Sequence, residues 1–253
     1  MHKHITLRPW YSLIASADHA ILEAYKELAR RAITTILLAD QGGWLTYKDY
    51  AKKTGLSIHT IQTDDGIINP HDIPALQNSA LIINSLAAYT APQPMRAISE
   101  RCTALGITLI NDVSGSIGTA EATYGDIILG SFGKDKPVNA HYGGFIAADT
   151  PIAIEHTFDD KHRPLILHHL DLLDSRLAFL HRVHQQIKHD LAALDIVHRD
   201  AQGINVIVKF HTPDEKKRIL EYCEKHAYPV TLCPREIRIL SPAISIEVKR
   251  LTK

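Results

Sequence analysis

The sequence predicts an α/β protein in which a mostly parallel, doubly wound sheet precedes a small C-terminal α+β domain. Apolar runs typical of buried strands alternate with segments of helical periodicity over residues 17–150. This alternation favours right-handed crossovers, so that strands run parallel and helices cover both faces of the sheet. A long helical stretch at 165–194 separates this part from a shorter segment with its own strands. We therefore expect a large domain at 1–160, a connecting helix at 161–198 and a small domain at 199–253.

The individual elements follow from the order of the apolar runs and of the glycines and prolines between them. In the first part we expect helices at 17–32, 47–55, 70–77 and 92–106, and strands at 33–40, 56–63, 79–86, 107–115, 124–133 and 143–149. In the last part we expect a strand at 203–210, a helix at 212–226 opened by Thr212 and Pro213, and strands at 228–234, 235–242 and 243–251.

Composition and charge narrow the classes of function. Lys plus Arg and Asp plus Glu number 28 each, so no overall positive field points to nucleic acid. The three cysteines are far apart and form no C-x-x-C pair, which favours a reducing compartment over a disulfide framework. The N-terminus lacks an apolar core of signal-peptide length, and no stretch approaches the roughly 18 apolar residues of a membrane span. We expect an unprocessed cytoplasmic protein without a nucleic-acid or membrane partner.

In proteins with an open parallel sheet, ligands bind beyond the carboxyl ends of the strands, so we expect the functional residues there. Four groups of residues have such positions: 42–44, 87–89, Asp112 and 131–136. Asp112 is the last residue of an apolar run, where its carboxylate would be partly buried and would need a cation or a hydrogen-bond donor as its partner. The alternative is that Asp112 only caps the segment that follows. Lys136 is either a nucleophile, since a buried neutral amine attacks carbonyls, or an ordinary solvated lysine.

The histidines do not predict a metal site. His181 and His184 can share one face of the long helix, but no carboxylate or cysteine completes a zinc signature. We interpret this region as a solvated helix and expect no metal.

Two motifs within residues 80–149 carry a resemblance to a known family. A strand that ends in aspartate is followed by a loop to glycine, DVSGSIG at 112–118. The next strand begins G-D and continues through S-F to a lysine and two glycines, in GDIILGSFGKDKPVNAHYGG at 125–144. This region resembles the large domain of fold-type I pyridoxal-phosphate enzymes, most closely DegT/DnrJ-type aminotransferases. The layout of the whole chain is similar to that fold, in a shortened form.

The resemblance implies pyridoxal 5′-phosphate as cofactor and transamination between a small-molecule amino donor and a keto acceptor. By matching position, Lys136 is the Schiff-base lysine, Asp112 keeps the pyridine nitrogen protonated, Ser131 donates to the cofactor phosphate and Trp44 stacks on the pyridine ring. A homodimer is also implied, because a neighbouring subunit completes the pocket in this fold. A pyridoxal-phosphate-dependent lyase and a non-catalytic homologue with a structural or regulatory role are the alternatives.

Three further residues matter for this comparison. Arg238 is the candidate for gripping a substrate carboxylate, with an exposed strand residue as the alternative. Asp18 stands where the family binds the cofactor phosphate, so its carboxylate either competes for the helix amides or turns away as the helix N-cap. Gly115 stands where the family commonly has a polar residue near the oxygen on the cofactor ring.

Overall fold

The computed structural model describes residues 5–252, and its largest element is a seven-stranded sheet of order β1-β9-β8-β7-β4-β2-β3. Its strands are β1 (Trp10–Ile14), β2 (Thr35–Ala39), β3 (Ser57–Ile61), β4 (Ser79–Asn84), β7 (Thr108–Asp112), β8 (Ile127–Ser131) and β9 (Gly144–Ala148). The pairs β2-β3, β2-β4, β4-β7 and β7-β8 are parallel, whereas β8-β9 and β1-β9 are antiparallel. The mostly parallel sheet predicted from the sequence is therefore confirmed, and β1 adds an edge strand that the sequence pattern did not indicate.

Helices cover both faces of this sheet, as a doubly wound fold requires. The helices are α2 (Ala17–Arg30), α3 (Thr46–Lys53) and α4 (Met95–Leu105). Alternate residues of the strands point to opposite sides: Leu38 packs with α2 and α3, whereas Leu37 packs with α4. α4 ends at Gly106, whose φ of 65° is the left-handed conformation that glycine adopts without a Cβ penalty.

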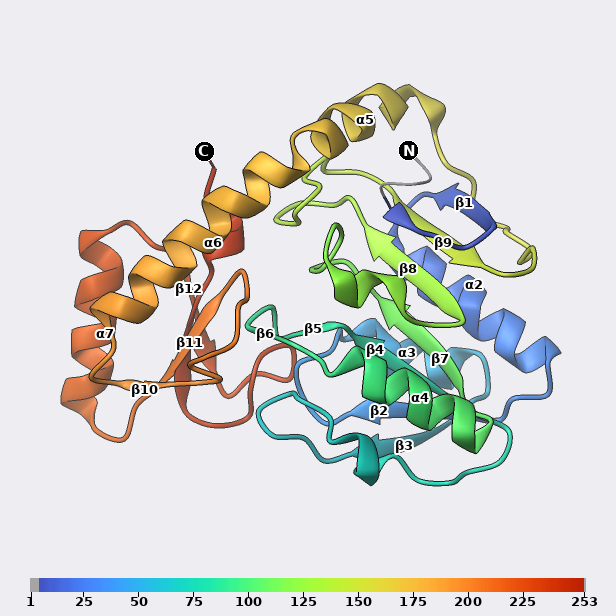
Figure 1. The fold of residues 1–253 in the computed structure, drawn as a ribbon, viewed down its shortest axis with the longest axis horizontal. Coiled ribbons are helices and arrows are strands. Elements are labelled where there is room, and N and C mark those ends of the chain that lie inside the picture. The colour runs from blue at the N-terminus through green and yellow to red at the C-terminus, as the bar shows by residue number, and fades with distance from the viewer. Residues whose placement is uncertain (1–4, 253) are drawn as a thin grey trace.

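The long helical stretch expected at 165–194 is two helices. α5 (Arg163–Asp171) and α6 (Leu173–Asp190) meet at Leu172. Figure 1 shows them running from above the large sheet to the second sheet. The single connecting helix was therefore wrong in its continuity, although helix accounts for most of the stretch.

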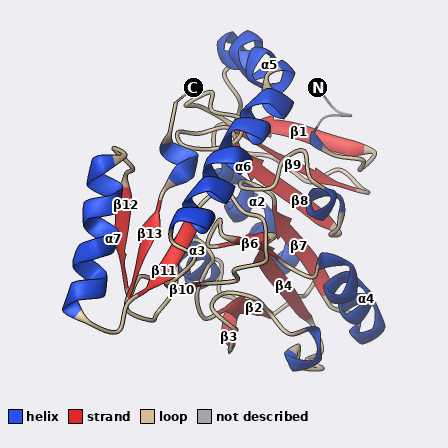
Figure 2. Cartoon of the chain, turned by 60° about the vertical axis from the view of Figure 1, so that its left-hand side comes forward, coloured by secondary structure: helices blue, strands red, loops and turns tan. Residues whose placement is uncertain are grey.

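The second sheet has four antiparallel strands in the order β10-β11-β13-β12. They are β10 (Asp195–Ile196), β11 (Val206–Lys209), β12 (Val230–Cys233) and β13 (Ala243–Ile246), with α7 (Pro213–Lys225) between β11 and β12. One face of this sheet packs on α6 and α7, as Figures 1 and 2 show. The other face places Ile207 against Ala88 of the large-sheet part. A small C-terminal α+β unit is thus present.

Two local expectations differ from the structure. The segment 235–242 forms a loop instead of a strand, and the helix expected at 70–77 is a single 3-10 turn, η1 (Pro70–Asp72). Residues after β4 make a small antiparallel ribbon of β5 (Leu86–Ala87) and β6 (Ala91–Pro92). Within residues 5–252, no helix combines the length and apolarity needed to cross a membrane.

Candidate active site

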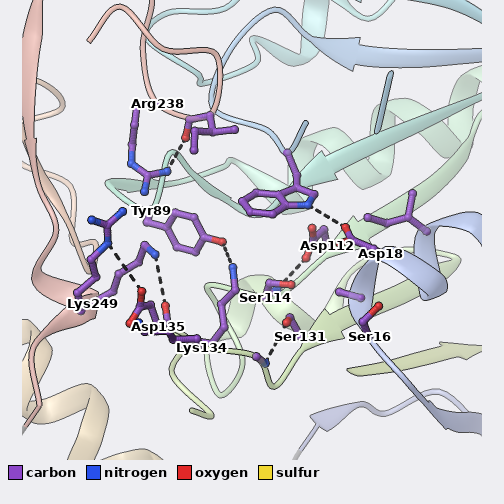
Figure 3. Close-up of a pocket in the computed structure, with 17 residues that line it drawn as sticks. Ser16, Asp18, Tyr89, Asp112, Ser114, Ser131, Lys134, Asp135, Arg238 and Lys249 are labelled. Carbon is purple, nitrogen blue, oxygen red and sulfur yellow. Dashed lines mark hydrogen bonds and ion pairs between the residues drawn. The ribbon is translucent and has the colours of Figure 1, made fainter. Parts of the chain in front are cut away.

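A cavity of about 330 Å³ lies beyond the carboxyl ends of the large-sheet strands and is closed on one side by the C-terminal unit. Figure 3 shows the side chains that line it. The five residues to which the sequence analysis gave a role in binding or catalysis are among them: Trp44, Asp112, Ser131, Lys136 and Arg238. The strand-end rule and the motif positions therefore select residues that the fold brings to one place.

Asp112 is the last residue of β7 and is only 3% exposed. Its Oδ2 accepts a hydrogen bond of 2.6 Å from the Tyr47 hydroxyl, and its Oδ1 accepts one of 2.9 Å from the Ser114 backbone N–H. Burial, and then the neighbouring Asp112 carboxylate, raise the pKa of Tyr47 well above its ordinary value, so the phenol stays a donor. Asp112 therefore caps the following loop and also faces the cavity, so the two sequence interpretations are compatible.

Lys136 is half-buried in the loop after β8, and its Nζ donates a hydrogen bond to the Tyr89 hydroxyl. The same Nζ lies 4.8 Å from the centre of the Tyr89 ring and 5.2 Å from that of Trp44. Lys134 also lines the cavity but is exposed. The lysine that the motif selects is thus the one held between two aromatic rings.

Tyr89 is a site residue that sequence reasoning placed only in a strand-end group. It is 3% exposed and has a φ of 65°, unusual for a side chain of this size. A Cβ on Gly115 would lie 2.7 Å from Tyr89 Cδ1, so glycine at 115 makes room for the ring. The Tyr89 carbonyl accepts 2.9 Å hydrogen bonds from the backbone N–H groups of Ile204 and Asn205 in the C-terminal unit. The Tyr89 backbone is therefore tied to the C-terminal unit, while its ring lies against Gly115 of the large-sheet part.

The N-terminus of α2 forms another wall of the cavity. Ser16 is the N-cap, and its Oγ accepts from the His19 N–H at 3.2 Å. Asp18 lies in the first turn and lines the cavity, where its Oδ1 accepts 2.9 Å hydrogen bonds from Trp44 Nε1 and from the Thr46 hydroxyl. The interpretation of Asp18 as an outward-turned N-cap is therefore wrong, because Ser16 has that position.

Ser131 ends β8 and lines the cavity next to the loop that carries Lys136. Its Oγ accepts a hydrogen bond from the Gly133 N–H at 3.0 Å. The hydroxyl proton remains available for a further acceptor.

Arg238 is 2% exposed and lies in the loop between β12 and β13, so the alternative of an exposed strand residue is wrong. Its Nε and Nη2 donate to the two carboxylate oxygens of Glu247, both at 2.7 Å. Glu247 is fully buried; burial opposes its charge, but the Arg238 hydrogen bonds and charge lower its pKa to about 2. Arg238 therefore lines the cavity with its guanidinium already held by a carboxylate.

No group of three or more histidine, cysteine, aspartate or glutamate side chains is arranged to hold a metal ion in the part of the chain that the structure describes. His184, one of the histidines considered from the sequence, is 1% exposed, and its Nε2 accepts from the Gly203 N–H at 3.3 Å. Burial, with smaller contributions from neighbouring charges, lowers the pKa of His184 to about 3. The expected solvated helix is thus buried at this position.

Comparison by sequence covers only the C-terminal part. Residues 176–253 match the family described as the MJ1341 family C-terminal domain. No curated protein matches the chain.

Comparison by structure covers nearly the whole chain. 3-Amino-5-hydroxybenzoic acid (AHBA) synthase superposes with a TM-score of 0.74 and 12% identity over 97% of this chain and 83% of its own. Helicobacter pylori PseC, an aminotransferase involved in the biosynthesis of pseudoaminic acid, superposes with a TM-score of 0.75 and 13% identity, over 95% of this chain and 81% of its own. NtdA from Bacillus subtilis, with bound cofactor PMP, superposes with a TM-score of 0.74 and 14% identity, over 95% of this chain and 69% of its own. A sphingosine-1-phosphate lyase from Burkholderia pseudomallei is also similar, with a TM-score of 0.71. At these identities the likeness establishes the fold, which is the one expected from the sequence.

Proposed function

We propose that this protein is a pyridoxal-phosphate-dependent enzyme with Lys136 as its reactive amine, and that it transfers an amino group from a small amino donor to a keto acceptor. The observation that carries the proposal is the convergence of Lys136, Asp112 and Trp44 on one cavity in a fold that a PMP-bound protein shares. Asp112 and Lys136 are the minimum that the cofactor chemistry requires.

The residues around the cavity fit this cofactor. Asp112 accepts two hydrogen bonds, and an ionised carboxylate can accept more, so it would hold a proton on a ring nitrogen. The Ser114 hydroxyl is buried in the wall without a hydrogen-bond partner, and a polar atom of a ligand would satisfy it. The first turn of α2 and the Ser131 hydroxyl would hold a phosphate, because free amides and the helix dipole favour an anion there.

The bound cofactor supplies an electron sink for the carbon next to the substrate amino group. The chain supplies the proton transfers and the geometry. Lys136 would move a proton to and from the substrate through its Nζ, and its hydrogen bond to Tyr89 holds this atom between Tyr89 and Trp44. Trp44 would cover one face of a flat ring, and its bond to Asp18 fixes the indole in that position.

The bond that is broken distinguishes the two enzyme classes. A lyase shares this fold, so a lyase reaction is the second candidate. Incubation with candidate amino acids, followed by product analysis, separates them: transamination converts the amino acid to its keto acid with equal amination of an added acceptor, whereas a lyase cleaves a carbon–carbon bond without an acceptor.

The direct test compares two lysines of the same loop. Purified wild type, Lys136→Ala and Lys134→Ala are mixed with pyridoxal phosphate, reduced with borohydride and digested, and the labelled peptide is identified by mass spectrometry. We expect a visible absorbance band and a label at Lys136 in wild type and in Lys134→Ala, and neither in Lys136→Ala. A label that disappears in Lys134→Ala instead would contradict the assignment. No label in any of the three proteins would favour the non-catalytic homologue.

We further propose that the protein acts as a homodimer. Leu45 follows Trp44 directly and is 50% exposed, and Leu240, whose N–H donates to the Gln41 side chain, is 46% exposed. Leu45 adjoins a residue of the cavity wall, so a second subunit that covers it would also help to close the cavity. Light scattering at micromolar concentration should give twice the mass of the chain, and a monomer would refute this part of the proposal.

A further inference from the structure

Three cationic groups surround the ring of Tyr89 in the cavity, and two of them come from the C-terminal unit. The cationic groups of Lys249, Lys136 and Arg238 lie 4.6, 4.8 and 5.3 Å from the centre of its ring. Figure 3 shows Arg238 and Lys249 on this side, with Tyr89 between them and the large-sheet residues. Each of these groups requires a negative partner or an acceptor, because charges removed from water are costly without one.

Arg238 has such partners. Besides the two 2.7 Å bonds to Glu247, its Nη1 donates to the Ile237 carbonyl at 2.6 Å. Glu247 in turn accepts from the Ser245 hydroxyl at 3.0 Å and from the Asn205 amide at 3.2 Å. The Arg238–Glu247 pair is thus satisfied within the protein, and neither member needs a ligand.

Lys249 lacks a close partner. It is 6% exposed and lines the cavity, yet its Nζ lies 3.4 Å from the Asp135 carbonyl oxygen and 3.9 Å from the Glu247 carboxylate. A good ammonium–oxygen hydrogen bond is about 2.7–2.9 Å long. Lys249 is therefore a buried amino group that faces a cavity, and within the protein its Nζ makes only one long hydrogen bond and one distant ion pair.

The charges of the cavity wall point the same way. Five cationic side chains line it, Lys134, Lys136, Arg238, Lys249 and Arg250, against three carboxylates, Asp18, Asp112 and Asp135. Two of the carboxylates, Asp18 and Asp112, accept hydrogen bonds from residues of the large-sheet part. Arg238 is neutralised by Glu247, so the charges that remain around Lys249 are those of Lys136, Lys249 and Arg250 against Asp135, which is an excess of positive charge.

We propose that Lys249 binds an anionic group, a carboxylate or a phosphate, on the substrate that enters this cavity, and that Arg238 instead supports the site by neutralising Glu247. Arg250 lines the same wall, with its Nε 3.6 Å from Glu247 and 3.8 Å from Asp135, and adds positive charge at the rim. The proposal rests on the proposed function only in calling the ligand a substrate. It names the substrate class as an acidic compound.

The first test is chemical labelling of the full chain with acetic anhydride at neutral pH, followed by peptide mass spectrometry. Succinate, a dicarboxylate, and inorganic phosphate are the two anionic probes, and neutral succinamide is the control. We expect at least one anion to slow the labelling of Lys249 roughly tenfold, with no effect on exposed Lys134. Protection by succinate alone identifies a carboxylate site, and protection by phosphate alone identifies a phosphate site. Equal labelling of Lys249 with and without both anions, or equal protection by succinamide, overturns the proposal.

The second test measures the affinity for the protective anion by calorimetry in three variants. Lys249→Met should lose roughly tenfold or more in affinity, because one charged contact is removed, whereas Lys249→Arg should keep most of it. Lys134→Met is the matched control, since it removes an exposed lysine from the same cavity. Unchanged affinity in Lys249→Met would refute the assignment. Borohydride labelling of Lys136 is unaffected by this outcome, so the two proposals fail separately.

Discussion

The indole nitrogen of Trp44 donates a 2.9 Å hydrogen bond to the carboxylate of Asp18, which links the loop after β2 to the first turn of α2. This contact gives Asp18 a structural role in the cavity wall. It also leaves a negative charge beside the helix N-terminus where a phosphate would bind. The two consequences can be separated by substitution.

Asp18→Asn should tighten pyridoxal-phosphate binding by roughly tenfold, because it removes a like charge but retains an acceptor oxygen for Trp44. Asp18→Ala should remove the acceptor as well and alter the environment of the indole. Titration of the cofactor absorbance measures the first effect. Trp44 fluorescence, in a Trp10→Phe background, measures the second. An unchanged dissociation constant in Asp18→Asn would mean that the phosphate lies away from Asp18.

Tyr47→Phe should destabilise the protein by roughly 2 kcal/mol, because it leaves the buried Asp112 carboxylate without its phenolic donor. Tyr25→Phe is the matched control. The Tyr25 hydroxyl is fully buried and has no hydrogen-bond partner, so its removal should leave stability unchanged or raise it. Urea denaturation of both variants measures the contrast, and equal losses would contradict it.

Stability at acid pH should depend on Glu247. Its pKa is lower in the folded protein, about 2 against an ordinary value of 4.5, so the stabilisation is present above pH 4.5 and is lost as the pH falls toward 2. This difference corresponds to about 3 kcal/mol. Glu247→Gln leaves Arg238 buried without a counter-charge and should be roughly 3–5 kcal/mol less stable at neutral pH.

The difference in stability between wild type and Glu247→Gln should therefore become smaller as the pH falls from 5 toward 2. Thermal unfolding across this range measures it. Glu155→Gln, which changes an exposed carboxylate paired with Lys26, should follow the wild-type profile. A difference that stays constant with pH would show that Glu247 does not titrate in this range.

Anion binding at Lys249 should weaken as the pH rises. Burial, with the nearby charge of Lys136 as the next cause, lowers the pKa of Lys249 to about 7. The ammonium is present below that pH and is lost above it, so the affinity for succinate should fall by up to about tenfold per pH unit above pH 7. Lys249→Arg should remove most of this dependence, because guanidinium stays charged. Identical pH profiles for the two proteins would contradict the prediction.

The sheet and most of the cavity wall are predictable from the sequence because they depend on local patterns. Strands of the β4 type are continuous apolar runs, and the residues that follow them lie at one edge of a parallel sheet. The motif positions then select Lys136 over Lys134. The edge strand β1 escapes prediction because it is only partly buried and pairs with β9, which lies far away in the sequence.

The C-terminal side of the cavity was harder to predict. REIRIL has strand composition, but Arg238 must reach the Glu247 carboxylate, and the chain forms a loop to place it there. The break between α5 and α6 at Leu172 could not be predicted, because no proline or glycine marks it in the sequence. Lys249 and Tyr89 are 160 positions apart in the sequence, and only the pairing of the two structural units brings them together.

The backbone bonds from Ile204 and Asn205 to the Tyr89 carbonyl join the two units at the cavity wall. Every residue except proline has the same main-chain donor and acceptor. Substitutions that keep the main chain in place therefore leave these bonds between the two units intact. Gly203 is the exception, because a Cβ there would collide with the carbonyl of Thr90. The junction between the two units at the cavity therefore depends on the course of the main chain at residues 89 and 203–205 more than on the identity of the side chains that line the cavity.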